Sequence, residues 1–376
     1  MAAVLFVSNG HGEAAIAARI AAAVRGLDAR LTTEHLALVG KGNGGAEFAD
    51  AGPQRTMPSG GLIAMGNVRN IARDLRAGLA VLTVRQSVFL RRAGHRYRCV
   101  VAVGDAFALA VALIARRPAL FVGTAKSVHV APYGPLERRI LRAAREVFVR
   151  DAATARALAD HGLVAAAPGN VIMDLLAEGA NFAWPSAERV AVLPGSRPAA
   201  YDDAPLLARV IRDAAAIRPQ LSAALSVAPQ LEAERFATAC EEAGFEVRRS
   251  SDPERPFDGY AFGRLIVRAW RGPLGSLLRE ATVALGQAGT ANEAAAGNGI
   301  PVVALARGRR TGWYRMRQAR LLGDALVVAS EHSAASEVAA LLGDPDRRSA
   351  MGRVGRERMG PPGGATAIAR RIVACA

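Results

Sequence analysis

The sequence contains only three cysteines among 376 residues, and Cys99, Cys240 and Cys375 lie far apart. So few and so widely spaced cysteines argue against a disulfide-stabilised scaffold, and their spacing matches no zinc-binding motif. We therefore expect a protein of a reducing compartment, the cytoplasm.

A long hydrophobic run is also missing. No stretch is long and apolar enough to span a bilayer, and no basic region precedes the first apolar run, as a signal peptide would require. Any association with a membrane is therefore expected to be peripheral, at the inner face of the cell membrane.

Aromatic residues make up only 5% of the sequence, whereas hydrophobic residues make up 51%. The cores must be built from alanine, valine, leucine and isoleucine, a composition that suits parallel sheets covered by helices. A chain of this length is long enough for two domains with a core each.

Lysine is scarce in a strongly basic protein. The net charge is +15, yet only Lys41 and Lys126 of the 48 basic residues are lysines. An anionic membrane, a nucleic acid and phosphorylated substrates are the partners that such a charge favours. We expect no nucleic acid, because the sequence has neither interleaved aromatic residues nor a recognised nucleic-acid-binding module.

Residues 60–94 combine apolar residues at helical spacing with a series of arginines. One interpretation is a set of core-facing helices with a solvated arginine face. The other is a basic surface that lies on anionic lipid without insertion. In that interpretation the contacts come from arginines in and just after this segment: Arg85, Arg91, Arg92, Arg96 and Arg98.

Predicted strands and helices alternate along the chain in two successive sets, beginning with the apolar run Val4–Val7. Two such sets predict an α/β protein with two doubly wound, Rossmann-like domains and a cleft between them. We expect a first domain at 1–183, a second at 187–350 and a helical tail at 351–376, with the linker at 179–188.

The stretch Ala281–Ala304 predicts a strand, a glycine-rich turn, a helix and a second strand. Glycine lets the backbone approach a diphosphate, and the start of a helix favours an anion. Here Gly289 and Thr290 would contact phosphate, and the carboxylate of Glu293 would accept the hydroxyls of a ribose. The alternative is a tight turn in which Thr290 caps the helix and Glu293 completes a capping box.

Other turns also follow predicted strands. Pro194–Arg197 opens the second set, and Asp105 follows the strand at 99–103, so both would lie at the carboxyl edge of a parallel sheet. The alternative role of Asp105 is to cap the next helix. His11, in the turn after the first strand, is a second candidate base.

Several of these motifs occur in the order found in lipid-A-disaccharide synthases. SNGHGE, VAVGD, GNVIMDLL, VLPGSR and GTANEAAAGNGIPVVAL resemble the corresponding stretches of that family, from Val4 to about Val328. The resemblance implies the GT-B fold and an inverting glycosyltransferase. Such an enzyme would move a sugar of the N-acetylglucosamine type from a UDP-sugar to a lipid or lipid-linked acceptor, without a metal or other cofactor.

The resemblance also assigns residues. Asp105 would be the general base, with His11 as its partner or substitute, and Glu293 would hold the ribose. The diphosphate in the second domain would be bound by two groups of residues: Gly195, Ser196 and Arg197, and Gly289 with Thr290. The acceptor in the first domain would be bound by the first turn: Asn9, Gly10, Gly12 and Glu13.

The first turn departs from the family. It carries His11-Gly12-Glu13 where the family usually has Ala-Ser-Gly-Asp, and a histidine there is more similar to lipid-linked cell-wall glycosyltransferases of the same fold. The segment from Lys126 to Tyr133 replaces an aromatic segment of the acceptor loop. The resemblance therefore supports the family's donor class for this chain better than its acceptor, and the chain resembles a divergent relative of that family.

Two other functions stay open. A UDP-sugar 2-epimerase would use the same nucleotide site, would need several acid and base groups around the sugar, and would need no lipid acceptor. A non-catalytic protein that binds a nucleotide sugar would need the nucleotide site alone. The sequence indicates neither the sugar nor the oligomeric state.

Overall fold

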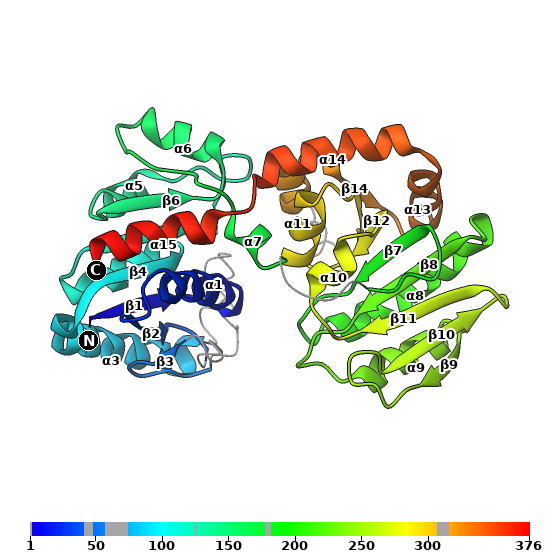
Figure 1. Ribbon diagram of the computed structural model, residues 1–376, viewed down its shortest axis with the longest axis horizontal. Helices are drawn as coiled ribbons and strands as arrows, with labels where there is room; N and C mark the ends of the chain where they lie inside the picture. Colours follow the sequence, from blue (N-terminus) through cyan, green and yellow to red (C-terminus); the bar gives the residue numbers. More distant parts are fainter. Residues whose placement is uncertain (1, 41–47, 57–73, 125, 177–181, 307–315) are drawn as a thin grey trace. The chain divides into compact units, whose positions relative to one another are not determined.

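The structure is a computed structural model and describes residues 2–40, 48–56, 74–124, 126–176, 182–306 and 316–376. The chain forms two compact units, of which unit 1 comprises Met1–Leu175 and Gly360–Ala376, and unit 2 comprises Leu176–Met359 (Figure 1). The residues of the predicted tail at 351–376 are thus divided between the two units. The predicted linker at 179–188 lies partly outside the described residues.

Unit 1 is built on a six-stranded sheet in the order β3-β2-β1-β4-β5-β6, in which every neighbouring pair is parallel. After β1 the chain adds strands on one side, and from β4 onward it adds them on the other, which is the doubly wound order. The strands are β1 (Ala3–Ser8), β2 (Thr32–Ala37), β3 (Ala49–Asp50), β4 (Tyr97–Gly104), β5 (Ala119–Gly123) and β6 (Glu146–Val149).

The central strands of unit 1 are buried on both faces, since every residue of β1 and of β5 is buried. Such continuous apolar strands are typical of parallel sheets with helices on both faces. The helices are α1 (His11–Leu27), α3 (Leu79–Ala93), η3 (Gly94–Arg96), α4 (Ala106–Ala112), η4 (Leu113–Ala115), α5 (Pro135–Leu141), α6 (Ala152–Ala159), α7 (Val171–Asp174) and α15 (Gly364–Cys375). The first part of the predicted arginine-rich segment, up to residue 73, lies outside the described residues.

The motif GNVIMD attaches the carboxyl-terminal segment to unit 1. Gly169 and Gly364 approach so closely that a Cβ on either would lie within 3.0 Å of the other's backbone. The carboxylate of Asp174 accepts the N–H groups of Gly363 and Ala365 and thereby caps the start of α15. Helix α15 packs against α1 and α7 (Figure 1). This part of the family resemblance therefore rests on residues with a structural role.

Unit 2 contains an eight-stranded sheet in the order β14-β13-β12-β7-β8-β11-β10-β9. The strands from β14 to β11 pair in parallel, whereas β10 pairs antiparallel with β11 and with β9. The strands are β7 (Glu188–Leu193), β8 (Leu221–Ser226), β9 (Glu246–Arg249), β10 (Phe257–Ala261), β11 (Leu265–Trp270), β12 (Val283–Gly286), β13 (Val302–Leu305) and β14 (Leu326–Ala329).

A strand begins inside the polar, proline-containing stretch at 249–259, where the composition gives no sign of one. Strand β10 begins at Phe257, and its residues alternate between buried and half-buried along Phe257–Ala261. Asp258 and Gly259, which are rare in strands, conceal this alternation in the sequence. The sheet of unit 2 therefore ends in an antiparallel edge, which a strictly parallel interpretation does not include.

The helices of unit 2 surround this sheet, and α14 packs against α11 so closely that a Cβ on Gly355 would lie 2.2 Å from the carbonyl oxygen of Ala296. Residues 351–359 of α14 lie within the predicted helical tail, whereas its first turns, from Pro345, precede that tail. The helices are α8 (Ala200–Ile217), α9 (Ala233–Glu242), α10 (Leu274–Leu278), α11 (Thr290–Gly297), a helix at 316–322, η5 (Gly323–Ala325), α13 (Ala334–Gly343) and α14 (Pro345–Met359).

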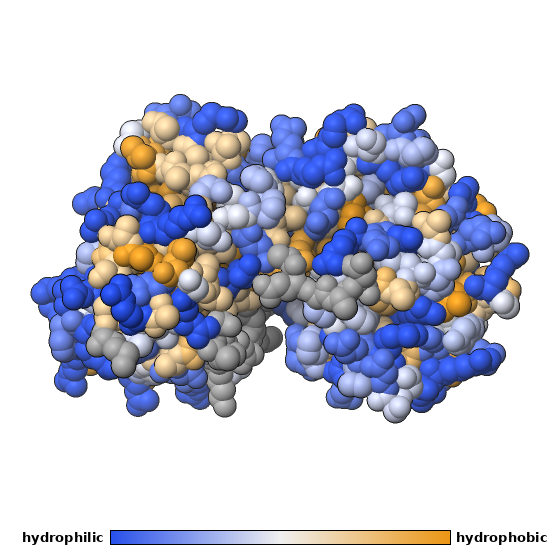
Figure 2. All heavy atoms as spheres, viewed as in Figure 1, coloured by the Kyte–Doolittle hydropathy of each residue, from blue (hydrophilic) through white to orange (hydrophobic). Residues whose placement is uncertain are grey.

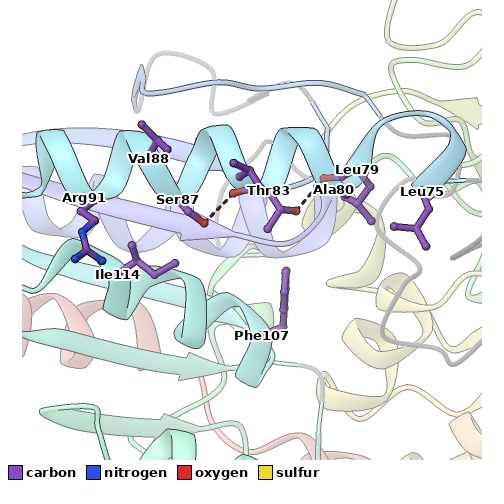
Figure 3. Close-up of a pocket in the computed structure, with 10 residues that line it drawn as sticks. Leu75, Leu79, Ala80, Thr83, Ser87, Val88, Arg91, Phe107 and Ile114 are labelled. Carbon is purple, nitrogen blue, oxygen red and sulfur yellow. Dashed lines mark hydrogen bonds between the residues drawn. The ribbon is translucent and has the colours of Figure 1, made fainter.

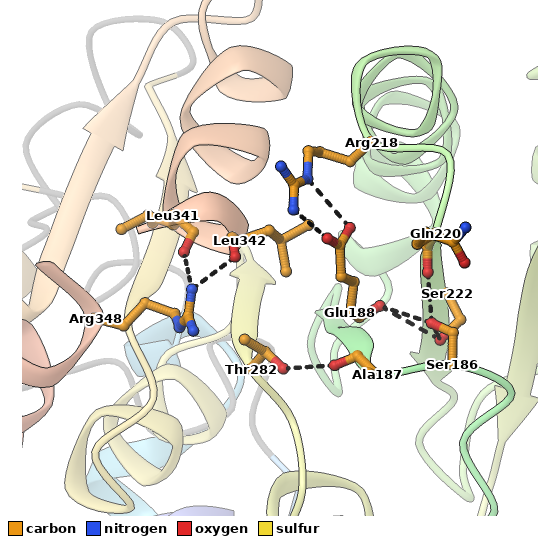
Figure 4. Close-up of polar contacts among 10 residues, drawn as sticks. All are labelled: Ser186, Ala187, Glu188, Arg218, Gln220, Ser222, Thr282, Leu341, Leu342 and Arg348. Carbon is orange, nitrogen blue, oxygen red and sulfur yellow. Dashed lines mark hydrogen bonds and ion pairs between the residues drawn. The ribbon is translucent and has the colours of Figure 1, made fainter. Parts of the chain in front are cut away.

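Polar side chains at the amino-terminal edge of the unit 2 sheet are used for structural contacts (Figure 4). The hydroxyl of Ser186 donates to the carbonyl of Gln220 at 2.6 Å. Glu188, at the start of β7, forms an ion pair with Arg218, which follows α8. These contacts join the strand starts to neighbouring elements, and the predicted site residues lie at the opposite edge, where the strands end.

Hydrophilic side chains cover most of the visible face of each unit, with smaller hydrophobic areas between them (Figure 2). Scattered apolar side chains are ordinary on a folded protein, and only a contiguous patch needs an explanation. Within the described ranges, no helix is both long enough and apolar enough to cross a membrane.

Candidate functional site

The predicted phosphate-binding residues lie at the switch point of the unit 2 sheet. Strands β7 and β12 are parallel neighbours, and the chain adds strands on one side after β7 and on the other after β12. Ligands of doubly wound sheets bind at the carboxyl edge of such a point. Gly195–Arg197 follows β7, and Gly289 precedes the helix after β12. The fold therefore brings both groups to one edge.

The two turns are in direct contact. The N–H groups of Gln287 and Ala288, after β12, both donate to the carbonyl of Leu193 at the end of β7, at 2.9 and 3.1 Å. A Cβ on Gly195 would lie 3.8 Å from the Cα of Ala288. Gly195 has a φ of +117°, which residues with a side chain rarely adopt. Glycine therefore shapes the backbone at this edge.

Helix α11 begins beside these turns with Gly289 as its N-cap, and this residue has no side chain of its own to cap the helix. The alternative in which Thr290 is the N-cap is therefore wrong. The side chain of Thr290 is exposed, and Glu293 is half-buried in the first turn of the helix. The N–H groups of a helix start, together with the helix dipole, favour an anion at this position.

Two buried side chains that the sequence analysis missed hold the turn after β12. Gln318 donates from Nε2 to the carbonyl of Gly289 at 3.0 Å. Asn292, which has no exposed surface, donates from Nδ2 to the carbonyl of Gly286 at 3.1 Å and lies 3.3 Å from Oε1 of Gln318. A buried asparagine in an otherwise alanine-rich helix was the available signal, since buried polar side chains almost always have a bonding role.

The predicted base Asp105 lies at the switch point of unit 1, where β1 and β4 are parallel neighbours. Its Oδ1 accepts the N–H of Ala108 at 3.0 Å, so Asp105 is the N-cap of α4, as its alternative role predicts. Its Oδ2 accepts from Nδ2 of Asn9 at 3.1 Å. A carboxylate oxygen can accept two hydrogen bonds, so each oxygen retains capacity for a further proton donor.

Gly104 and Glu13 complete this corner of unit 1. Gly104 has a φ of +137°, and a Cβ there would lie 3.4 Å from Cγ of Glu13 and 3.6 Å from Cβ of Asn9. The structure thus brings together Asn9, Glu13 and Asp105, which the sequence places in two separate turns. Glycine before Asp105 permits the positive φ of this turn.

The remaining residues of the predicted acceptor turn lie at the start of α1. Gly10 is the N-cap, with an extended backbone and no side chain of its own to cap the helix. A Cβ on Gly12 would meet no atom within 4 Å. His11 is the first residue of α1, and the structure describes only its backbone. The roles of these residues therefore stay predictions.

A buried tyrosine that the sequence analysis did not assign lies against Gly123, the last residue of β5. Tyr133 is 3% exposed, its hydroxyl has no hydrogen-bond partner among the described residues, and a Cβ on Gly123 would lie 2.5 Å from that hydroxyl. Burial raises the pKa of Tyr133 above its ordinary value, and the charges of Glu137 and Asp105 act in the same direction. Tyr133 therefore provides a neutral hydroxyl at this edge.

Asp151 occupies at the end of β6 the position that Asp105 occupies at the end of β4. Its Oδ1 accepts the N–H of Thr154 at 2.7 Å, so Asp151 is the N-cap of α6. Its Oδ2 is buried and has no hydrogen-bond partner within the described residues. The neighbouring Arg150 donates to the carbonyl of Thr124 at 3.3 Å. Asp151 is therefore a second carboxylate at this edge, with a cap of the same kind.

No group of three or more histidine, cysteine, aspartate or glutamate side chains in the described parts of the chain could hold a metal ion. If a diphosphate binds at the unit 2 turns, its charge would have to be balanced there by arginine, backbone N–H groups and the helix start. That no metal is needed stays an expectation.

The fold is similar to that of solved UDP-N-acetylglucosamine 2-epimerases and of a solved glycosyltransferase. The UDP-N-acetylglucosamine 2-epimerase of Neisseria meningitidis, solved with UDP-N-acetylglucosamine, has a TM-score of 0.57 at 13% identity, covering 99% of this chain and 100% of its own. The 2-epimerase of Methanocaldococcus jannaschii has a TM-score of 0.56 at 12% identity over 100% of both chains. The glycosyltransferase SnogD of Streptomyces nogalater has a TM-score of 0.53 at 16% identity over 99% of both chains.

These similarities identify the architecture as GT-B, with two Rossmann-like units. At such low identity they show the fold alone. No family model matches the sequence, and no curated protein matches it. The specific resemblance to lipid-A-disaccharide synthases therefore stays a prediction from the sequence motifs.

Proposed function

We propose that this chain is an enzyme that acts on a UDP-sugar, with the nucleotide bound at the turns after β7 and β12. The observation that carries the proposal is the contact between Gly195 and Ala288, which brings two turns about ninety residues apart to one switch point. One turn supplies Arg197 and the other the start of α11. Both groups favour an anion.

Each predicted residue has a role in this proposal. Arg197 and Ser196 are exposed and would bind the diphosphate together with the N–H groups around Gly289 and Thr290. Glu293, one turn into α11, would accept the two ribose hydroxyls. Gln318 and Asn292 act indirectly, because they hold the turn that presents these groups.

Epimerisation of the sugar is the reaction that the comparisons favour, because two of the three structures described above are UDP-N-acetylglucosamine 2-epimerases. Inverting C2 requires that a base remove its proton while the electron pair left at C2 expels UDP from C1, which forms a C1–C2 double bond. A proton then returns to the other face of C2 as UDP adds back to C1, so the reaction needs both a base and an acid. We assign the base to Asp105. Tyr133, whose buried hydroxyl lies against Gly123 at the end of the neighbouring strand β5, is the second proton-carrying group at that edge.

Inverting transfer of the sugar to a lipid acceptor is the second candidate, supported by the motifs VLPGSR and GTANEAAAGNGIPVVAL. In this reaction an acceptor hydroxyl attacks the anomeric carbon while the bond to the diphosphate breaks. The base takes one proton from that hydroxyl, and UDP leaves with the electron pair. Asp105 would again be the base, and the acceptor would be bound by residues of the first turn: Asn9, Gly10, Gly12 and Glu13.

Two assays on the same preparation separate these reactions. In the first, the enzyme is incubated with UDP-N-acetylglucosamine alone in D2O, and the products are followed by proton NMR. An epimerase gives the C2 isomer with deuterium at C2. In the second, radiolabelled UDP-sugars are incubated with a total lipid extract, and a transferase moves label into the organic phase while releasing UDP.

The Glu293→Ala variant is the control in both assays, since it removes a proposed nucleotide contact. Calorimetry with UDP tests the shared premise. If the folded wild-type protein binds neither UDP nor any UDP-sugar, the proposed function is wrong in both forms. Binding of UDP without either reaction would favour the non-catalytic alternative.

A further inference from the structure

An apolar groove crosses the surface of unit 1 between α3 and the helical segment of α4 and η4 (Figure 3). Its volume is about 660 Å³. In Figure 3 the side chain of Phe107 points from α4 toward α3, and Ile114 lies further along the same wall. The residues that line it are predominantly aliphatic: Leu75, Leu79, Ala80, Val84, Val88 and Ile114, with Phe107.

Large apolar side chains are exposed in this groove. Val84 is 63% exposed, Leu75 is 52% exposed and Phe107 is 47% exposed. Exposed apolar side chains gathered into one concave surface, as here, mark a site of contact with another apolar body. Phe107, which lines the groove, follows the predicted base Asp105 by two residues in the chain.

The hydroxyls of the groove do not make it polar. Thr83 donates from Oγ1 to the carbonyl of Leu79 at 2.9 Å, and Ser87 donates from Oγ to the carbonyl of Thr83 at 2.8 Å (Figure 3). Each hydroxyl therefore uses its proton within its own helix. A molecule in the groove would therefore contact mainly carbon atoms, at these two positions as at the aliphatic ones.

Charge indicates what that molecule is. Helix α3 contains no acidic residue, and its exposed face carries Arg85, Arg91 and Arg92. Arg91 also lines the groove. Exposed Arg96 and Arg98 follow directly. An apolar surface with arginines along its border complements a layer of anionic phosphate groups above hydrocarbon, whereas an acidic peptide would not need the hydrocarbon face.

We propose that the groove between α3 and α4 is the surface by which unit 1 docks onto an anionic phospholipid membrane. Val84, Val88 and Phe107 enter the boundary between headgroups and acyl chains, and Arg85, Arg91 and Arg92 bind lipid phosphates. This docking does not depend on which sugar reaction the enzyme performs. The sequence alone predicted a basic surface that lies on anionic lipid, and the groove adds apolar side chains to that contact.

The test is co-sedimentation of the full chain with two kinds of vesicle, at low and at high salt. One kind contains phosphatidylcholine alone, and the other contains phosphatidylcholine with roughly 30% phosphatidylglycerol. The apolar variant is Val84→Asp, and its matched control is Val164→Asp, because Val164 is 92% exposed in the same unit and outside the groove. The basic variant is Arg85→Gln with Arg91→Gln and Arg92→Gln. Circular dichroism confirms that each variant is folded.

We expect Val84→Asp to lower partitioning onto anionic vesicles on the order of tenfold, with Val164→Asp close to wild type. The triple arginine variant should lose a similar or larger factor and most of the salt dependence. Equal losses for Val84→Asp and Val164→Asp would overturn the proposal. So would a shift of oligomeric state by Val84→Asp with unchanged vesicle binding, because the groove would then join two copies of the chain.

Discussion

The two switch points of this protein are built from different materials. In unit 2 the edge consists of two glycine-shaped turns and a helix start, with Ser196, Arg197 and Thr290 exposed around them. In unit 1 the edge consists of side chains that contact one another, among them Asn9 and Asp105. The same topology thus presents backbone donors in one unit and acid side chains in the other.

This difference divides the proposed labour. Backbone N–H groups and arginine cannot lose a proton at ordinary pH, so the unit 2 edge is suited to holding an anion. Carboxylates and hydroxyls can exchange protons, so the unit 1 edge, with Asp105 and Tyr133, is suited to acid–base chemistry. Variants at one edge should therefore change binding, and variants at the other should change turnover.

The largest effect is expected at Asp105. Asp105→Asn removes the base but keeps a good N-cap for α4, so the fold should persist. We expect turnover to fall by about 10²–10⁴-fold, the usual contribution of a general base, with UDP affinity unchanged. Steady-state kinetics and UDP calorimetry on the same variant measure the two quantities.

The matched control is Asp151→Asn, because Asp151 caps α6 with the same geometry at the same sheet edge. If both variants lose turnover equally, the loss reflects this edge in general and not one base. His11→Ala addresses the second candidate. A loss confined to His11→Ala would transfer the role from Asp105 to His11, and normal turnover in all three variants would exclude this mechanism.

The next largest effect is expected in unit 2. Glu293→Ala should weaken UDP binding by about 1–3 kcal/mol, the cost of removing a charged hydrogen-bond partner, and calorimetry measures it directly. The matched control is Glu337→Ala, for which we expect unchanged UDP affinity. Glu337 also lies in the first turn of a helix, α13, and it forms an ion pair with Arg347. Equal affinities for wild type and Glu293→Ala would remove Glu293 from the nucleotide site.

Much of this arrangement could be predicted from sequence. Apolar runs followed by glycine give the parallel strands and their turns, and doubly wound topology then requires that the turns after β7 and β12 meet. Asp105 and Asp151 were identifiable as caps because each directly precedes a helix. These features depend on neighbours in the chain or on a general rule of connection.

Other features depend on contacts that no local pattern encodes. The hydrogen bond from Gln318 to Gly289 joins residues 29 positions apart, and Tyr133 reaches Gly123 from within a loop. The return of the chain to unit 1 rests on Asp174, 189 residues before the Gly363 N–H that it accepts. The groove of unit 1 combines α3 with α4 and η4, so its apolar component was not visible in the charge pattern of α3 alone.

The smallest predicted difference between the units is in how far the stability of each unit falls as the pH is lowered. His35 of β2 is fully buried, its Nε2 lies 2.8 Å from the Ser8 hydroxyl, and its ring stacks on Phe48 at 4.8 Å. Burial lowers its pKa to about 4, partly offset by the charge of Asp50. Unit 2 contains one histidine, His332, and it is exposed. Among the described residues, the histidine whose pKa is lowered by burial therefore lies in unit 1.

Because the folded pKa of His35 lies below the ordinary value, the unfolded chain binds the proton more tightly. Its contribution to the stability of unit 1 is therefore complete above about pH 6.5 and declines as the pH falls toward 4, by at most about 1.4 kcal/mol per pH unit. Denaturant unfolding of wild type and of His35→Gln, at pH values from roughly 7 to roughly 4, measures this slope of stability against pH. Hydrogen exchange of the amides in β2 reports on unit 1, and that of the amides in β8 reports on unit 2. We expect the wild type to lose protection in β2 at higher pH than in β8, and His35→Gln to reduce that gap, since glutamine can still bond to Ser8 but does not titrate. An identical pH slope in both proteins would show that carboxylates alone set the acid sensitivity of unit 1.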